Sequence, residues 1–272
     1  MDRLDMSLEQ AGYLEFRGAH LYSVLHKAPD PLARVLLVGP FASERHFSYT
    51  TWVQWARFLA ARRIEALRFD YRGIGESTGQ FEDLSFSDWL QDAEFLAWFL
   101  QRSFPQAPLI LHGLEMGALL AGRVFSTGIG EALLSWGPPA NANEVLRRPL
   151  SRQAFKNLYL RKSMSDYIGE LESNHSMEVE GYQWKAGLWK DSFQFQAAPA
   201  PGGQTASAHD SGKPLRAVPL EGSLASVFRG SAMGYIAGQI PDLTEFFTEN
   251  YAWIVEALEL SRERNIECRY PN

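Results

Sequence analysis

Short apolar runs alternate with longer amphipathic stretches along this chain. The apolar runs, bounded by turn-forming or polar residues, predict strands over residues 12–16, 21–26, 34–38, 65–69, 109–111, 132–136 and 215–220. Apolar side chains at helical spacing predict helices over 51–63, from an N-cap at Ser87 onward, over 117–125 and over 242–264. Strands and helices that alternate in this rhythm form a mostly parallel sheet with helices on both faces. We therefore predict an α/β fold that binds ligands beyond the carboxyl ends of its strands.

The rhythm breaks between residues 141 and 196. We interpret this segment as a cap inserted over the sheet. The next segment, 197–214, is rich in Ala, Pro, Gly and Ser and is expected to be a flexible loop. No internal repeat is visible, so we interpret residues 1–272 as a single α/β domain with an inserted cap.

Composition narrows the classes of protein. Hydrophobic residues make up 46% of the chain, which is ample for a core, and the net charge of −6 argues against a nucleic-acid partner. Cys268 is the only cysteine, which excludes an intrachain disulfide and a cysteine-based metal site. No apolar run approaches the roughly 18 to 20 residues that span a bilayer, and residues 1–5 lack the pattern of a secretion signal. We expect a cytoplasmic protein that does not span a membrane and carries no cofactor and no metal.

The segment 112–117, His-Gly-Leu-Glu-Met-Gly, joins a predicted strand to a predicted helix. A sharp strand-to-helix turn needs small residues on either side of its tip, and Gly113 and Gly117 supply them. The side chain at the tip is expected to be strained and exposed. A nucleophile elbow of the form Gly-x-Ser-x-Gly has serine at this position, whereas this chain has Glu115.

With its predicted strands, helices and turns in this order, the chain resembles the α/β-hydrolase superfamily over most of its length. Residues 70–77 match the superfamily's D-x-R-G-x-G-x-S turn. Within the superfamily, the chain is most similar to the hydrolase-like proteins associated with exosortase A systems. That likeness lies in the P-F-A-x-E segment at 40–45, the G-x-F segment at 79–81 followed by Trp89-x-x-Asp92, and the glycine–tyrosine pair within 178–182. The resemblance implies an α/β-hydrolase fold and a link to polysaccharide export or surface-protein processing.

A serine hydrolase needs a nucleophile, a histidine base and an acid that orients the histidine. In this superfamily the histidine is expected between the last strand and the closing helix, here residues 221–242, and that stretch contains none. His209 lies earlier, in the predicted loop. The backbone N–H groups of Phe41 and Met116 are the candidate oxyanion-hole donors, or form only a turn and a helix start. Serine-type acyl transfer is therefore not expected.

Glu115 still has chemistry open to it. A carboxylate on the elbow can be an alkylating nucleophile, as aspartate is in haloalkane dehalogenases and epoxide hydrolases of this fold. An apolar pocket could instead raise its pKa and make it a general acid or base. The alternatives are that Glu115 binds a ligand, or that the catalytic position is lost and the carboxylate caps the following helix.

Two other residues are candidates for the same pocket. Glu44 and His46 follow the oxyanion loop and could join Glu115 in a carboxylate–histidine site, although a surface loop is the simpler interpretation. His112 is expected to be a packed core histidine. Asp70 and Arg72 are expected to brace their turn by hydrogen bonds and an ion pair.

Basic residues gather at the start of the predicted cap, namely Arg147, Arg148, Arg152, Lys156, Arg161 and Lys162. Three of them, Arg148, Arg152 and Lys156, share one helical face, and apolar residues lie opposite. The basic face is either simply solvated or receives an anionic partner. Such a partner could be a phosphopantetheine arm, a charged sugar or an anionic lipid.

Two functions remain from the sequence. One is a degenerate α/β-hydrolase, a pseudoenzyme with a binding or accessory role for a small-molecule ligand, with a link to exopolysaccharide. The other is an active hydrolase of a small ester, halide, epoxide or lactone that uses Glu115 as nucleophile or general acid/base.

Overall fold

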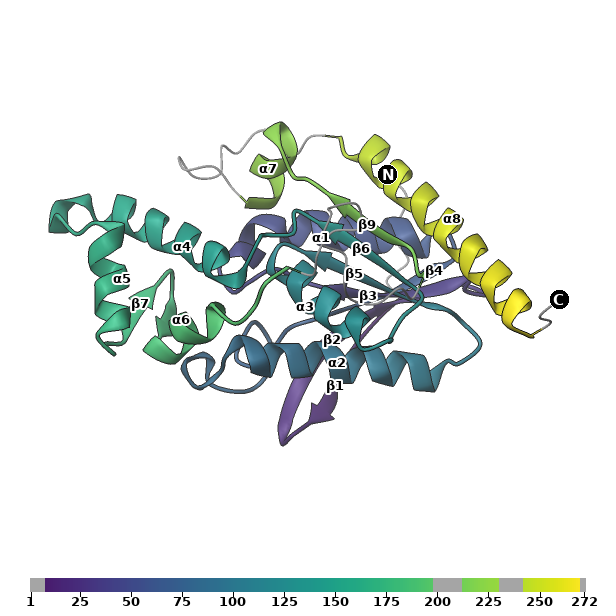
Figure 1. The fold of residues 1–272 in the computed structure, drawn as a ribbon, viewed down its shortest axis with the longest axis horizontal. Coiled ribbons are helices and arrows are strands. Elements are labelled where there is room, and N and C mark those ends of the chain that lie inside the picture. Colours follow the sequence, from purple (N-terminus) through teal and green to yellow (C-terminus); the bar gives the residue numbers. More distant parts are fainter. Residues whose placement is uncertain (1–7, 198–211, 230–241, 270–272) are drawn as a thin grey trace.

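A seven-stranded sheet forms the centre of the molecule (Figure 1). The computed structural model describes residues 8–197, 212–229 and 242–269, with side chains to residue 263. The strands lie in the order β1-β2-β4-β3-β5-β6-β9. Their bounds are β1 Glu9–Phe16, β2 Ala19–His26, β3 Ala33–Val38, β4 Ile64–Phe69, β5 Leu109–Leu114, β6 Ala132–Trp136 and β9 Leu215–Val218. The pairs β1–β2 and β2–β4 are antiparallel and the other pairs are parallel, which confirms the predicted fold class.

Helices cover both faces of the sheet (Figure 1). They are α1 Glu44–Ala60, α2 Phe86–Ser103, α3 Met116–Ser126, α7 Gly222–Arg229 and α8 Thr244–Arg269. Successive side chains of a strand point to opposite faces. Leu36 and Val38 accordingly join a core with α2 and α3, whereas Val35 and Leu37 join one with α1, α7 and α8. The buried centre of the sheet therefore holds the carboxyl ends of β3 and β5 in place.

Two helices begin earlier than their apolar periodicity predicts. Helix α1 starts at Glu44. The hydrophobic pattern misses its first turns because the side chains buried there, including Glu44 and Ser48, are polar. Helix α2 has its N-cap at Ser85 instead of Ser87, because Ser85 and Asp88 form a reciprocal capping box. The earlier start of α1 moves Glu44 from the expected surface loop into a helix.

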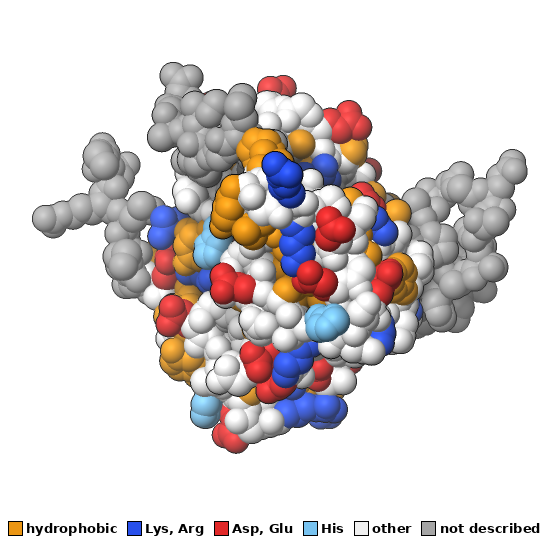
Figure 2. All heavy atoms as spheres, turned by 90° about the vertical axis from the view of Figure 1, so that its left-hand side faces the viewer, with side chains coloured by type: hydrophobic (Ala, Val, Ile, Leu, Met, Phe, Trp, Pro, Cys, Tyr) orange, Lys and Arg blue, Asp and Glu red, His pale blue; other side chains and the backbone are white. Residues whose placement is uncertain are grey.

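A helical lobe, residues 142–192, lies between β6 and β9 and projects to one end of the molecule (Figures 1 and 2). It consists of α4 Ala142–Lys156, η3 Leu158–Leu160, α5 Met164–Glu172, β7 Met177–Val179, β8 Tyr182–Trp184 and α6 Ala186–Ser192. Trp184 and Trp189 are buried and belong to the same core as α2 and α3. The expected flexible loop falls mostly on residues 198–211, which lie outside the described residues.

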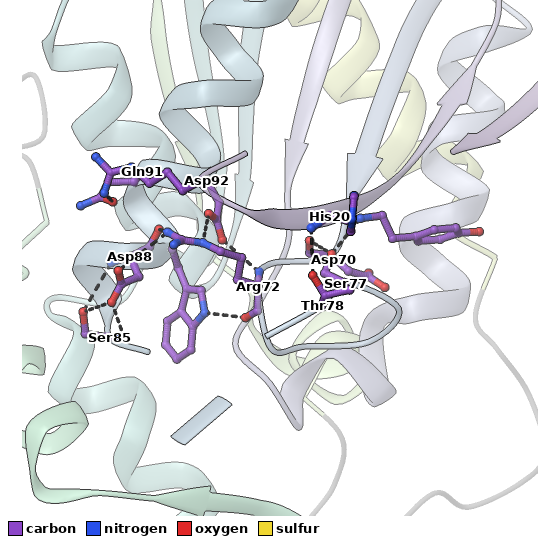
Figure 3. A network of polar contacts seen from close by, with 12 residues as sticks. His20, Asp70, Arg72, Ser77, Thr78, Ser85, Asp88, Gln91 and Asp92 are labelled. Carbon is purple, nitrogen blue, oxygen red and sulfur yellow. Dashed lines mark hydrogen bonds and ion pairs between the residues drawn. The ribbon is translucent and has the colours of Figure 1, made fainter. Parts of the chain in front are cut away.

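The turn after β4 is braced by two separate ion pairs, and Figure 3 shows the one between Arg72 and Asp92. The carboxylate of Asp70 accepts from Arg45 at 2.8 Å, and that of Asp92 accepts from the backbone N–H and the Nε of Arg72 at 2.9 and 2.6 Å. Asp70 and Arg72 thus brace the turn by hydrogen bonds and ion pairs, as expected, and each finds its ion-pair partner on a neighbouring helix. The indole of Trp89 donates to the Arg72 carbonyl at 3.1 Å, so both residues of the W-x-x-D segment hold this turn.

Candidate functional site

The turn between β5 and α3 has the strained backbone of a nucleophile elbow. Glu115 has φ 54° and ψ −118°, a conformation that costs a non-glycine residue about 1–3 kcal/mol. Gly117 lies so close to the carbonyl oxygens of Val38 and Gly39 that a Cβ there would overlap them. A Cβ on Gly113 would overlap the backbone of Ala118. The two glycines thus permit the elbow, which keeps its shape with glutamate at its tip.

The Glu115 side chain is buried, not exposed as expected, and both of its oxygens are engaged. Its side chain is only 1% exposed. Arg148 Nη2 of α4 donates to Oε2 at 2.5 Å, and Arg229 Nε of α7 donates to Oε1 at 2.5 Å. Hydrogen bonds between a guanidinium and a carboxylate are about twice as strong as those between neutral groups. Glu115 is the N-cap residue of α3, but its side chain makes no capping hydrogen bond to that helix.

A second buried carboxylate lies near the first. Glu44, in the first turn of α1, is fully buried and accepts from Arg152 Nη2 at 2.8 Å. Arg152 also donates from Nε and Nη2 to the two oxygens of Glu180, each at 2.8 Å. Burial raises the pKa of Glu44, with Arg152 and Arg148 opposing the shift and the Glu115 charge adding to it. The two carboxylates are therefore electrostatically linked through adjacent arginines of one helix.

This charge cluster corrects two expectations from the sequence. The surface-loop interpretation is wrong for Glu44, and the solvated-face interpretation is wrong for Arg148 and Arg152, whose side chains are only 24% and 16% exposed. Lys156, one turn further along α4, is 63% exposed. The face turns inward because the buried carboxylates neutralise its first two arginines.

His46 does not join the cluster. Its side chain is exposed on α1 and has no hydrogen bond or ion pair with Glu44 or Glu115 in the described part of the chain. The described residues contain no group of three or more histidine, cysteine, aspartate or glutamate side chains that could hold a metal ion. His112 is fully buried, with its ring centroid 5.0 Å from Trp52 and 4.5 Å from Trp136, and burial lowers its pKa. It is a packed core residue, as expected.

The candidate oxyanion donors lie on the two segments that meet at the elbow. Phe41 follows β3 and Met116 begins α3, and both side chains are buried. The close approach of Gly117 to the carbonyls of Val38 and Gly39 brings these two segments together. The arrangement keeps Phe41 and Met116 as candidates for binding a negatively charged atom through backbone N–H groups.

A wide cavity of about 350 Å³ opens beside the elbow, with Gly137, Leu220 and Arg229 in its lining. Gly137 has φ 56°, and a Cβ there would lie 2.8 Å from Glu115 Oε1. Arg229 thus contacts Glu115 with one edge of its guanidinium and borders the cavity. The cavity provides room for a small ligand next to the charge cluster.

Arg229 is the site residue that sequence reasoning missed. It lies in the stretch 221–242, where a catalytic histidine is expected, and it reaches the elbow side chain from there. Among the described residues, no histidine forms a hydrogen bond or ion pair with Glu115. A basic residue in this stretch, paired with an acidic residue at the elbow, is the signal that could have identified it.

Comparison with known proteins supports the α/β-hydrolase fold. The model of a hydrolase family, described as serine aminopeptidase S33, matches residues 45–127, which include the turn after β4 and the elbow. The α/β hydrolase GrgF from Penicillium sp. sh18 is similar in fold, with a TM-score of 0.58 and 14% identity over 92% of this chain and 99% of that one. None of the curated proteins compared with the chain matches it.

Two further solved structures cover the chain less completely. XC6422 from Xanthomonas campestris, an α/β serine hydrolase without a lid, is 23% identical with a TM-score of 0.43 over 51% of this chain and 65% of that one. An α/β serine hydrolase homologue from Coxiella burnetii is 17% identical with a TM-score of 0.42 over 48% and 64%. The chain thus spans slightly less than two thirds of each of these two proteins.

The sheet order, the elbow and the similarity to GrgF define an α/β-hydrolase fold. Among the described residues, no helix is both long enough and apolar enough to cross a bilayer.

Proposed function

We propose that this chain is a non-hydrolytic α/β-hydrolase-like protein that binds a small polar molecule in an accessory role in the cytoplasm. The observation that carries the proposal is the double engagement of Glu115, whose two oxygens each accept a hydrogen bond from a different arginine. Each oxygen therefore has one lone pair engaged by a guanidinium, and this charge pairing weakens the carboxylate as a nucleophile. The carboxylate also lacks a histidine partner among the described residues.

The cavity beside Arg229 is the proposed ligand site. The Arg229 side chain is 33% exposed, so its guanidinium can donate to an acceptor on a ligand while Nε holds Glu115. Carboxylate, phosphate and sugar hydroxyl groups are suitable acceptors. The likeness of residues 40–45 and of Trp89 and Asp92 to exosortase-associated proteins supports an accessory role linked to exopolysaccharide.

A second function is favoured by one observation. The elbow keeps a strained backbone at Glu115, and strain of this kind is usual where a side chain is presented for catalysis. In an active hydrolase, attack of a Glu115 oxygen on the carbonyl carbon of an ester or lactone would expel the alkoxide and give a mixed anhydride. Attack on the carbon of a haloalkane, which loses halide, or of an epoxide, whose opened ring oxygen takes up a proton, would give a glutamyl ester. Water would then have to hydrolyse that anhydride or ester, and the described residues provide no histidine to activate it.

A turnover screen separates the two functions. Short acyl esters, haloalkanes, epoxides and lactones are offered to the wild-type protein, Glu115→Gln and the control His209→Ala. The proposal predicts no turnover above background for any of the three. Turnover by the wild type and His209→Ala that disappears in Glu115→Gln would identify Glu115 as a catalytic carboxylate and overturn the proposal.

A further inference from the structure

The outer end of the helical lobe presents large apolar side chains to solvent. Four of them are 54–78% exposed, namely Phe155, Leu158, Tyr159 and Leu160. We call these four residues, together with Lys156, Arg161 and Lys162, the lobe tip. The end of α4 lies at one extreme of the longest axis of the molecule (Figure 1), and orange and blue side chains gather together on this face (Figure 2). Because the tip projects, its apolar side chains are not buried against the rest of the described protein.

The charge at the lobe tip has one sign. The chain contains no acidic residue between Glu144 and Asp166, and six basic residues lie in that interval. Arg148 and Arg152 pair with buried carboxylates and Arg147 donates to Asn143 at 3.0 Å, which leaves Lys156, Arg161 and Lys162 as the three cations of the tip. Lys162 pairs with Glu170 at 2.6 Å and Lys156 lies 3.6 Å from Glu180, whereas Arg161 has no ion pair with a described residue.

We propose that the lobe tip docks the protein peripherally on a membrane surface that carries anionic lipids. Apolar and aromatic side chains beside cations suit the boundary between lipid headgroups and acyl chains. There the apolar and aromatic side chains insert among the acyl chains, and the cations bind the headgroup phosphates. The tip projects, and a projecting apolar end enters a deformable lipid surface more readily than it forms the concave site needed to hold a peptide. The proposal is independent of whether Glu115 is catalytic.

Vesicle binding tests the proposal directly. The full chain is sedimented with vesicles of phosphatidylcholine alone and with vesicles containing about 30% phosphatidylglycerol. Tip variants are Leu158→Ser/Tyr159→Ser, which removes apolar area, and Arg161→Asn, which removes a charge. Arg161 has φ 53°, a conformation that asparagine tolerates. The matched control is Trp98→Ser/Arg102→Gln on α2, where an exposed tryptophan lies under an arginine on another part of the surface.

The wild type is expected to bind anionic vesicles about tenfold or more tightly than neutral ones, with weaker binding at high salt. Leu158→Ser/Tyr159→Ser should weaken binding about tenfold or more, and Arg161→Asn about fivefold, while the control binds as the wild type does. Circular dichroism and urea unfolding verify that each variant is folded. Absence of vesicle binding, or binding that the tip variants do not change, overturns the proposal. A concentration-dependent dimer that dissociates in Leu158→Ser/Tyr159→Ser, without vesicle binding, would show that a second copy covers the tip and would also overturn it.

Discussion

The turn after β4 and the elbow after β5 are each held by a buried carboxylate paired with arginine, but the two pairs are built differently. Asp92 is fully buried and accepts from the backbone as well as the side chain of one residue, Arg72. The carboxylate of Glu115 accepts only from side chains, and its partners Arg148 and Arg229 come from the helical lobe and from α7. The first pair braces the backbone of one turn, whereas the second ties three distant segments together.

This difference separates a structural ion pair from a candidate functional one. Arg72 is 10% exposed, and the described structure places the pair inside packed layers. Arg148 and Arg229 are 24% and 33% exposed, and Arg229 borders the cavity. Charges that reach solvent at a cavity can exchange a protein partner for a ligand, and charges that are fully enclosed cannot. The comparison predicts that the two pairs respond differently to substitution.

Asp92→Ala is expected to have the largest effect on stability. The change leaves the Arg72 guanidinium and its backbone N–H without their buried acceptor, and breaking a buried pair in this way costs about 4 kcal/mol. Urea unfolding of the variant beside the wild type measures the loss. Glu178→Gln, a substitution of an exposed carboxylate in the lobe, is the control and should change the free energy of unfolding by less than about 0.5 kcal/mol. A loss for Asp92→Ala as small as that of the control would show that the pair does not brace the turn.

Glu115→Gln is expected to cost less, about 2 kcal/mol, because the amide keeps one acceptor oxygen and the arginines are partly solvated. The measurement is again urea unfolding. An unchanged or increased stability would mean that the carboxylate does not stabilise the fold, as is common for a catalytic residue, and is not part of a stabilising cluster.

Arg229→Gln is expected to have a smaller effect, about 1 kcal/mol, since Glu115 retains Arg148 and the lost guanidinium was one third exposed. Arg62→Gln, a substitution of an exposed arginine at the end of α1, serves as the control. Equal losses for the two variants would argue against a role for Arg229 in holding the elbow.

The smallest effect is expected in the pH dependence of the free energy of unfolding, compared between the wild type and Glu44→Gln. Burial raises the pKa of Glu44 in the folded protein above its ordinary value of 4.5. At pH values between the pKa of Glu44 in the unfolded chain and its raised pKa in the folded protein, the folded protein binds more protons at this group. The contribution of Glu44 to stability therefore falls as pH rises. Relative to Glu44→Gln, the wild type should therefore lose free energy of unfolding as pH rises through this window. A difference curve that is flat, or that rises with pH, would contradict the raised pKa.

The sheet, the elbow and the core position of His112 could be predicted because each leaves a local pattern. Apolar runs mark the strands, and Gly113 and Gly117 mark the sharp turn whatever residue lies between them. The charge cluster left no such pattern. Arg229 is 114 residues from Glu115 along the chain, and Glu44 and Arg152 are 108 residues apart. Spacing within one element identified a shared basic face on α4, but only the tertiary structure shows that this face meets buried carboxylates.

The central claim is that the elbow has kept its shape while its side chain has become one member of an ion-pair cluster. A double-mutant cycle with Glu115→Gln, Arg229→Gln and the combined variant tests this claim most directly. Because the two residues contact each other in a buried setting, the free energies of unfolding should be non-additive, with a coupling of about 1–2 kcal/mol. Losses that add within about 0.3 kcal/mol would show that Arg229 does not hold Glu115 in solution, and would contradict the account.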